Sequence, residues 1–304
     1  MTKPVTNFAA SVRARLLAAT QRRKGEFHFT LQRYAAERFL YRLGASPHRD
    51  QFVVKGAMLF VLWDETILRP TKDLDLAGFW ANDGDSLAEA FREICAVPCP
   101  HDGLEFALET LEISSIRDAA EYHGFRFNVH VRLAGAVIPF QVDVGFGDAI
   151  VPPPIDVVYP VLLDGEAPRV RAYPPEAALA EKLHAMVSLG QANSRFKDFF
   201  DVWLLSSRFP FEGGRISAAI QATFARRKTT PLSPWPDALS PAFYTEPARS
   251  DQWIRYLKRT KLTDAPADFS AVGERVIAFL APPFRAVADA ATFQPTWPPG
   301  GPWR

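Results

Sequence analysis

The sequence of 304 residues lacks the features that mark membrane and secreted proteins. No stretch approaches the roughly 20 continuous apolar residues of a membrane-spanning helix. The first residues carry Arg and Lys without the apolar segment of a secretory signal. We therefore expect a cytoplasmic protein that has no membrane partner.

Cysteine is also scarce. The chain has two cysteines, Cys95 and Cys99, with no second pair of metal ligands near them. Disulfides rarely persist in a reducing cytoplasm, and zinc sites usually combine two such pairs. We expect both residues to be buried thiols, with a zinc site or a disulfide as the less favoured alternatives.

A large excess of charge of one sign is absent as well. The 35 Lys and Arg residues nearly balance the 34 Asp and Glu residues, which leaves a formal net charge of +1. The net charge therefore does not by itself indicate a nucleic-acid-binding protein. Three basic runs, at 22–24, 226–228 and 258–261, are typical of solvated helix faces when taken singly. Beside a phosphate-handling site they would favour an RNA-facing surface.

The spacing of apolar residues predicts a mixed first part and a mainly helical second part, which together form an α+β fold. The predicted helices of the first part cover 6–24, 30–43, 57–63 and 86–96, and the predicted strands cover 51–56, 73–79, 104–116, 125–133 and 137–146. The prolines of 151–154 are expected to end the sheet. We expect one domain over 1–165, a helical domain over 166–292, and a tail over 293–304 whose Pro and Gly content prevents regular structure.

The most informative stretch is Arg69-Pro-Thr-Lys-Asp-Leu-Asp-Leu-Ala-Gly-Phe79. As a strand, it would point the carboxylates of Asp73 and Asp75 to one face and the two leucines to the other. Two carboxylates this close repel each other unless a cation lies between them, and hard divalent ions such as Mg²⁺ prefer oxygen ligands. The pair alone is also typical of a solvated strand face, so the rest of the sequence has to decide between the two interpretations.

Two further features of the first part suit phosphate chemistry. Gly56 ends a predicted strand before a predicted helix, where backbone N–H groups can approach phosphate oxygens. Ala57 stands where a second Gly or Ser would strengthen this interpretation. Asp143 lies within an apolar strand, where an acid is costly to bury unless it is paired or bound to metal. We take Asp143 as a candidate third metal ligand, with exposure at a strand edge as the alternative.

The second part supplies a lysine and two acids. Lys182 lies in a predicted helix among apolar neighbours, and its ammonium group suits a triphosphate. Asp198 and Asp201 are three residues apart on another predicted helix and share a face. The alternative is a salt-bridge network with Arg195 and Lys197. His184 has no Ser or Cys partner motif, so we expect it to be a packed or surface histidine.

The motifs occur in an order that resembles the AbiEii/AbiGii family of nucleotidyltransferase toxins, which includes the mycobacterial MenT toxins. The likeness runs from about residue 30 to 205. Its motifs are Val54-Lys-Gly-Ala57, Arg69-x-Thr71-x-Asp73-x-Asp75, Glu176 with Glu181-Lys182-Leu, and Arg195-x-Lys197-Asp198-x-x-Asp201.

This resemblance implies a polymerase-β-like nucleotidyltransferase core joined to a helical C-terminal domain. It also implies a type IV toxin that has a separately encoded antitoxin as its partner. We expect the chain to be a monomer. The substrate would be a nucleoside triphosphate with Mg²⁺, bound as two ions, and the acceptor would be the 3′ end of tRNA or another RNA, which would block aminoacylation.

Carried over by position, the resemblance implies roles for individual residues. Asp73 and Asp75 would hold the metal together with the candidate Asp143, and Asp198 would be the late essential acid beside Lys182. The residues expected at the nucleotide are Gly56, Ala57, Arg69, Thr71, Lys182 and Arg195. Two alternatives stay open: nucleotidyl transfer to a protein or small molecule, and a non-catalytic module that binds a nucleotide or a partner.

Overall fold

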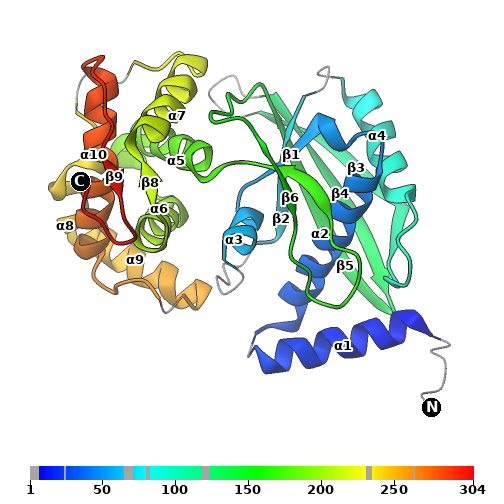
Figure 1. Ribbon diagram of the computed structural model, residues 1–304. Coiled ribbons are helices and arrows are strands. Elements are labelled where there is room, and N and C mark those ends of the chain that lie inside the picture. Colours follow the sequence, from blue (N-terminus) through cyan, green and yellow to red (C-terminus); the bar gives the residue numbers. More distant parts are fainter. Residues whose placement is uncertain are drawn as a thin grey trace. The chain divides into compact units, whose positions relative to one another are not determined.

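The computed structural model describes residues 7–23, 25–64, 71–79, 83–117, 123–230, 235–262 and 264–304. The chain divides into two compact units. The first combines Met1–Gly147 with Ile155–Ala172, and the second combines Asp148–Pro154 with Tyr173–Arg304. Figure 1 labels the elements of each unit.

The first unit is built on a mixed seven-stranded sheet with the strand order β3-β4-β5-β2-β1-β7-β6. Strand β2 runs parallel to β5 and antiparallel to β1, and β1 runs parallel to β7. The α+β class predicted from the sequence is confirmed. The strands are β1 (Phe52–Lys55), β2 (Asp73–Gly78), β3 (Glu105–Arg117), β4 (His123–Leu133), β5 (Ala136–Phe146), β6 (Ile155–Val158) and β7 (Arg169–Ala172).

The sheet does not end at the prolines of 151–154, so that expectation is wrong. The chain leaves the first unit at Asp148, returns to it at Ile155, and then adds β6 and β7 to the sheet. Val170 and Ala172 alternate with Arg169 and Arg171 and are fully buried, which ties β7 to the core. The sheet therefore extends past residue 165, the predicted end of the first domain.

The described residues of the first unit form the helices α1 (Phe8–Arg22), α2 (Phe27–Ala45), α3 (Met58–Trp63) and α4 (Gly84–Ala96), with a short 3₁₀ turn at Arg49–Gln51. Helix α2 packs against β5 and β7 (Figure 1). Phe39 of α2, Phe91 of α4 and Phe127 of β4 stack, with ring centroids 5.1 and 4.8 Å apart. One face of the sheet is thus buried, and the polar side chains of its strands must use the other face.

The second unit consists mainly of helices packed around aromatic side chains. Trp253, Phe199 and Phe269 are fully buried, and the ring centroid of Phe269 lies 5.2 Å from that of Trp253. Asp268 caps the N-terminus of α10, and Pro175 fits the first turn of α5. The elements are α5 (Pro175–Leu189), α6 (Phe196–Arg208), α7 (Gly213–Arg226), α8 (Pro241–Thr245), α9 (Pro247–Thr260), α10 (Phe269–Ala288), the strands β8 (Phe211–Glu212) and β9 (Thr296–Trp297), and 3₁₀ turns at Gly190–Ala192 and Asp237–Leu239.

The Pro- and Gly-rich tail does form regular structure, contrary to expectation. Strand β9 pairs with β8, and the buried indole of Trp297 donates a hydrogen bond of 2.7 Å to the carbonyl of Ser206. Trp303 stacks on Phe279 and donates to its carbonyl at 2.9 Å. Composition suggested a tail that could not pack, but two tryptophans among the prolines bury enough apolar surface to hold it.

Cys95 and Cys99 are free thiols. Cys95 is buried, and burial raises its pKa to about 12, which makes the thiol unreactive at neutral pH. Cys99 is half-buried, so the expectation of full burial holds for Cys95 only. Within the described residues, no helix is both long and apolar enough to cross a membrane.

Candidate metal and nucleotide site

Three carboxylates meet on the face of the sheet opposite α2 and α4. Asp73 and Asp75 lie on β2, and Asp143 on β5 stands directly beside Asp75 in the parallel register. One ligand oxygen from each residue lies within 4.8 Å of those from the other two. The alternation explains the arrangement, because Leu74 and Val142 of the same strands are completely buried. We call these three acids the triad.

Gly56 shapes the triad from the neighbouring strand. It follows β1, whose Lys55 stands opposite Asp75, and it has a left-handed φ of 71°. A Cβ at this position would lie 2.7 Å from Cγ of Asp75, closer than any side chain tolerates. The glycine is therefore required both by its backbone conformation and by the carboxylate next to it. Ala57 is buried at the start of α3, within the backbone turn that Gly56 opens.

Thr71 acts on the first acid of the triad. Its hydroxyl donates to Oδ1 of Asp73 at 2.5 Å and lies 3.2 Å from the backbone carbonyl of the same residue. The contact fixes the orientation of the Asp73 carboxylate. Thr71 is thus adjacent to the triad. Arg69, the other residue of this motif expected at the nucleotide, lies outside the described residues.

Arg126 is a neighbour of the triad that the sequence analysis missed. It stands opposite Asp143 in the β4–β5 hairpin and donates to both carboxylate oxygens, at 2.8 and 2.7 Å. Gln141 adds a third hydrogen bond to Asp143, at 3.0 Å. A tight turn at Ala134 and Gly135 sets this register, so pairing the two predicted strands across that turn would have found Arg126.

The second unit contains a separate cluster around Lys182. The Lys182 ammonium lies 3.2 Å from Oδ1 of Asp198 and 2.5 Å from Oδ2 of Asp201. Both aspartates are almost completely buried, and Arg195 donates to Asp198 at 2.7 Å. Burial by itself would raise the pKa of Asp198, but Lys182 and Arg195 outweigh it and hold that pKa below its usual range.

Arg195 and Lys197 were the expected salt-bridge partners of the two acids in the alternative interpretation of this segment. The pair between Arg195 and Asp198 forms, but Lys182 bridges both acids from the neighbouring helix α5. The resemblance placed Asp198 beside Lys182, but the residue patterns alone gave neither contact of Lys182, because both depend on how α5 packs against α6. His184, two residues after Lys182 on α5, is buried and hydrogen-bonded to Thr229, as expected for a packed histidine.

The donor set of the triad fits a hard divalent cation. It offers carboxylate oxygens only, from part-buried side chains that two backbone strands hold side by side. The Lys182 cluster differs from the triad in charge, because the positive charges of Lys182 and Arg195 offset the negative charges of the two buried aspartates. Its most exposed member is the Arg195 side chain, which is 47% exposed and open to an anion.

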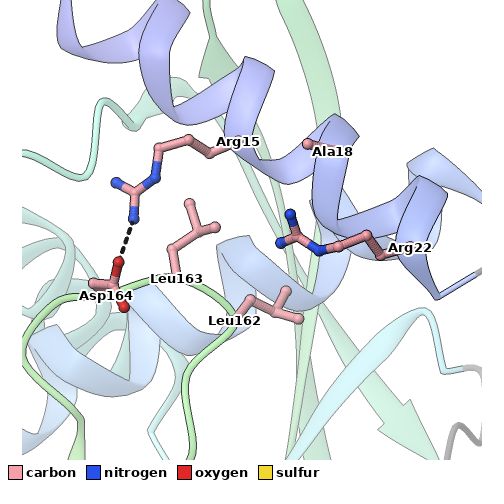
Figure 2. Close-up of a pocket in the computed structure, with 6 residues that line it drawn as sticks. All are labelled: Arg15, Ala18, Arg22, Leu162, Leu163 and Asp164. Atoms are coloured by element: carbon pink, nitrogen blue, oxygen red, sulfur yellow. Dashed lines mark hydrogen bonds and ion pairs between the residues drawn. The ribbon is translucent and has the colours of Figure 1, made fainter.

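A shallow pocket elsewhere in the first unit has no such chemistry. Arg15 and Arg22 of α1 face the segment 162–164 across a cavity of about 240 Å³ (Figure 2). Its one carboxylate, Asp164, pairs with Arg15 at 3.2 Å. The pocket therefore offers no set of metal ligands.

The family of the chain comes from comparison with known proteins. The chain belongs to the family described as "Nucleotidyl transferase AbiEii toxin, Type IV TA system", which matches residues 38–289. The family recognised from the sequence motifs is thereby confirmed. A type IV toxin–antitoxin system consists of a toxin and an antitoxin. An antitoxin partner therefore follows from the family.

Two solved structures, both from Helicobacter pylori, resemble the chain. A protein described as a putative nucleotidyltransferase is 13% identical, with a TM-score of 0.41, over 94% of this chain and 97% of its own. The protein JHP933 is 14% identical, with a TM-score of 0.45, over 88% of this chain and 94% of its own. No curated protein matches the sequence.

Proposed function

We propose that the chain is a Mg²⁺-dependent nucleotidyltransferase that transfers a nucleoside monophosphate from a nucleoside triphosphate to the 3′ end of tRNA. The triad of Asp73, Asp75 and Asp143 is the observation that carries this proposal. The choice of tRNA as acceptor rests on the resemblance to toxins that act on tRNA. A tRNA extended in this way could not be aminoacylated, and translation would stop.

In the proposed reaction, the 3′-hydroxyl oxygen of the acceptor forms a bond to the α-phosphorus while the bond to the β-phosphate oxygen breaks. The hydroxyl proton passes to solvent water, and pyrophosphate leaves. Bound Mg²⁺ would lower the pKa of the attacking hydroxyl and stabilise the negative charge on the phosphates. Asp73 and Asp75 would hold the metal on β2, and Thr71 would keep the Asp73 carboxylate in its orientation.

Lys182 and Arg195 are proposed to contact the triphosphate. A lysine ammonium is a compact charge suited to phosphate oxygens, and an arginine can bind them in a bidentate way. In the second unit, Asp198 and Asp201 hold the Lys182 ammonium in one place. We propose that Asp198 is essential because it fixes both cations, through contacts of 3.2 Å to Lys182 and 2.7 Å to Arg195.

The test is labelling of total RNA by each of the four α-labelled nucleoside triphosphates, with RNA and protein separated afterwards. The wild-type chain should label tRNA, and Asp73→Asn should not, although it keeps the shape of the side chain. Asp156→Asn changes an exposed acid of β6 and should label like the wild type. Undiminished labelling by Asp73→Asn would refute the site, and label on protein alone would refute the RNA acceptor.

The toxin role has its own test. Expression of the wild-type chain without its antitoxin should arrest growth, and Asp73→Asn should allow growth at equal protein levels. We propose that the toxin acts as a monomer, which size determination in solution would check. Growth arrest by Asp73→Asn would show that toxicity does not depend on the triad.

A further inference from the structure

Arg126 forms a bidentate charge pair with one acid of the triad. Its guanidinium contacts Asp143 in a fork geometry, with both bonds between 2.7 and 2.8 Å, and its side chain is 40% exposed. Bidentate pairs of this kind combine charge with fixed geometry. Arg126 and Asp143 stand directly opposite each other in the register of β4 and β5. The pairing therefore depends on the backbone as well as on the two side chains.

The hydrogen bonds limit what Asp143 can offer a metal. Oδ1 accepts from Nε of Arg126 and from Nε2 of Gln141, while Oδ2 accepts from the second guanidinium nitrogen. A carboxylate oxygen has two lone pairs. These three bonds use both lone pairs of Oδ1 and one of Oδ2. Asp143 can therefore give a metal one lone pair while it keeps Arg126.

The charge of Arg126 extends to the whole triad. Three ionised carboxylates within 4.8 Å of one another repel strongly, and a fixed guanidinium beside them reduces that repulsion. The hydrogen bond to Asp143 raises the pKa of Arg126, and the charges of Asp143, Asp73 and Asp75 raise it further. Arg126 thus interacts with all three acids and not only with its direct partner.

We propose that Arg126 is a resident counter-ion of the triad, which keeps the three carboxylates assembled without metal and lowers their affinity for a free divalent cation. The cation would then bind well only together with a triphosphate, whose negative charge offsets Arg126. Arg126 is a positioning residue in this role, because it acts through Asp143. The proposal rests on the metal site of the proposed function and adds a reason why that site favours metal with nucleotide over metal alone.

The test measures Mn²⁺ binding to the full chain without nucleotide, by electron paramagnetic resonance of the free ion. Arg126→Gln removes the positive charge, so the Kd for Mn²⁺ should fall at least about threefold, as expected for the loss of a unit charge beside a divalent site. Arg126→Lys keeps the charge without the fork and should bind Mn²⁺ within about twofold of the wild type. The same Mn²⁺ concentration should raise the Tm of Arg126→Gln more than that of the wild type.

Arg132→Gln is the matched control. Arg132 lies on the same face of β4, is similarly exposed at 44%, and also pairs with two carboxylate oxygens, from Glu105 and Glu109. Its loss should leave the Kd for Mn²⁺ unchanged. The counter-ion role would be overturned if the Kd of Arg126→Gln for Mn²⁺ were equal to or higher than that of the wild type. It would also be overturned if Arg126→Lys or Arg132→Gln lowered the Kd as much as Arg126→Gln does.

Asp75→Asn distinguishes a failure of the metal site from a failure of the counter-ion role. If this variant binds Mn²⁺ as the wild type does, the metal site of the proposed function fails and the role of Arg126 fails with it. If Asp75→Asn loses Mn²⁺ while Arg126→Gln binds it no more tightly than the wild type, only the counter-ion role is refuted.

Discussion

The carboxylate of Asp75 occupies the space in which a side chain at Gly56 would lie. A Cβ at position 56 would come within 2.7 Å of Cγ and 2.8 Å of Cβ of Asp75. The sequence suggested that this glycine lets backbone N–H groups approach a phosphate. In the structure, Gly56 also leaves room for the side chain of Asp75. With any other residue at this position, the second acid of the triad could not keep its position.

Gly56→Ala should therefore weaken metal binding as well as the fold. The left-handed backbone costs an alanine about 1 to 2 kcal/mol, and the new methyl group must in addition displace Asp75. We expect the Kd for Mn²⁺ to rise at least about tenfold, the equivalent of 1.4 kcal/mol.

Gly135→Ala is the control for the backbone effect alone. Gly135 has a φ of 80°, and a Cβ there would meet no atom within 4 Å. It should lose a similar amount of stability in thermal melting and bind Mn²⁺ normally. Normal Mn²⁺ binding by a folded Gly56→Ala would show that Asp75 does not need the space.

Patterns within single strands predicted all three acids of the triad. Asp73 and Asp75 follow from their alternation with leucine, and Asp143 from its apolar neighbours on another strand. Their meeting depends on β2 running parallel to β5, a crossover that local periodicity does not encode. Arg126 was missed for a related reason, since its role appears only when β4 is paired with β5 residue by residue.

The second unit was harder to predict, because its important contacts join different helices. Lys182 and its partners Asp198 and Asp201 are 16 and 19 residues apart, and only the packing of α5 on α6 brings them together. Helical spacing showed correctly that the two acids share a face. It could not show which cation that face would meet.

Lys182 is needed for the fold of the second unit as well as for its proposed contact with phosphate. Its ammonium pairs with two almost completely buried carboxylates, at 3.2 Å from Asp198 and 2.5 Å from Asp201. Breaking a buried charge pair by removing one partner typically costs about 3 to 5 kcal/mol. Lys182→Met should therefore lower the Tm strongly, and lost labelling activity in this variant would not by itself prove a catalytic role.

A double variant separates stability from function. Asp201→Asn removes one of the two negative charges, so Lys182→Met with Asp201→Asn should melt at a higher temperature than Lys182→Met alone. The double variant should still fail to label RNA, because the cation proposed to bind phosphate is gone. A Tm no higher than that of Lys182→Met would show that Asp201 and Lys182 do not depend on each other.

His184 should make the stability of the chain depend on pH below neutrality. Burial, together with the nearby Arg227 guanidinium, lowers its pKa to about 4. A nitrogen of Arg227 lies 3.1 Å from Nδ1 of His184, so this atom must accept a hydrogen bond while Nε2–H donates to Thr229 at 2.9 Å. A proton on Nδ1 would face the guanidinium directly.

The direction of the pH effect follows from where the proton binds. An unfolded histidine takes up a proton near pH 6.5, whereas the folded one does so only near pH 4. The contribution of His184 to stability is therefore complete above about pH 6.5 and is lost as the pH falls toward 4. His184→Gln should flatten the Tm curve between pH 6.5 and 4. An equally steep curve would mean that other groups dominate this range.

The C-terminal tail should be an integral part of the second unit. Trp297 is 2% exposed, donates to the Ser206 carbonyl of α6, and packs on Phe279 of α10 with ring centroids 4.9 Å apart. Replacing a buried Trp or Phe by Ala commonly costs about 3 to 5 kcal/mol. Trp297→Ala should thus lower the Tm of the second unit by several degrees or more.

The control for Trp297→Ala is Trp235→Ala, because the Trp235 side chain is 36% exposed and its removal leaves less buried surface unfilled. Removal of residues 294–304 should destabilise the second unit at least as much as Trp297→Ala, since it also deletes β9 and the stacking of Trp303 on Phe279. Mn²⁺ binding at the triad, which lies in the first unit, should persist in all three variants. A truncated chain that melts like the wild type would show that the tail adds nothing to stability and packs only as a surface strand.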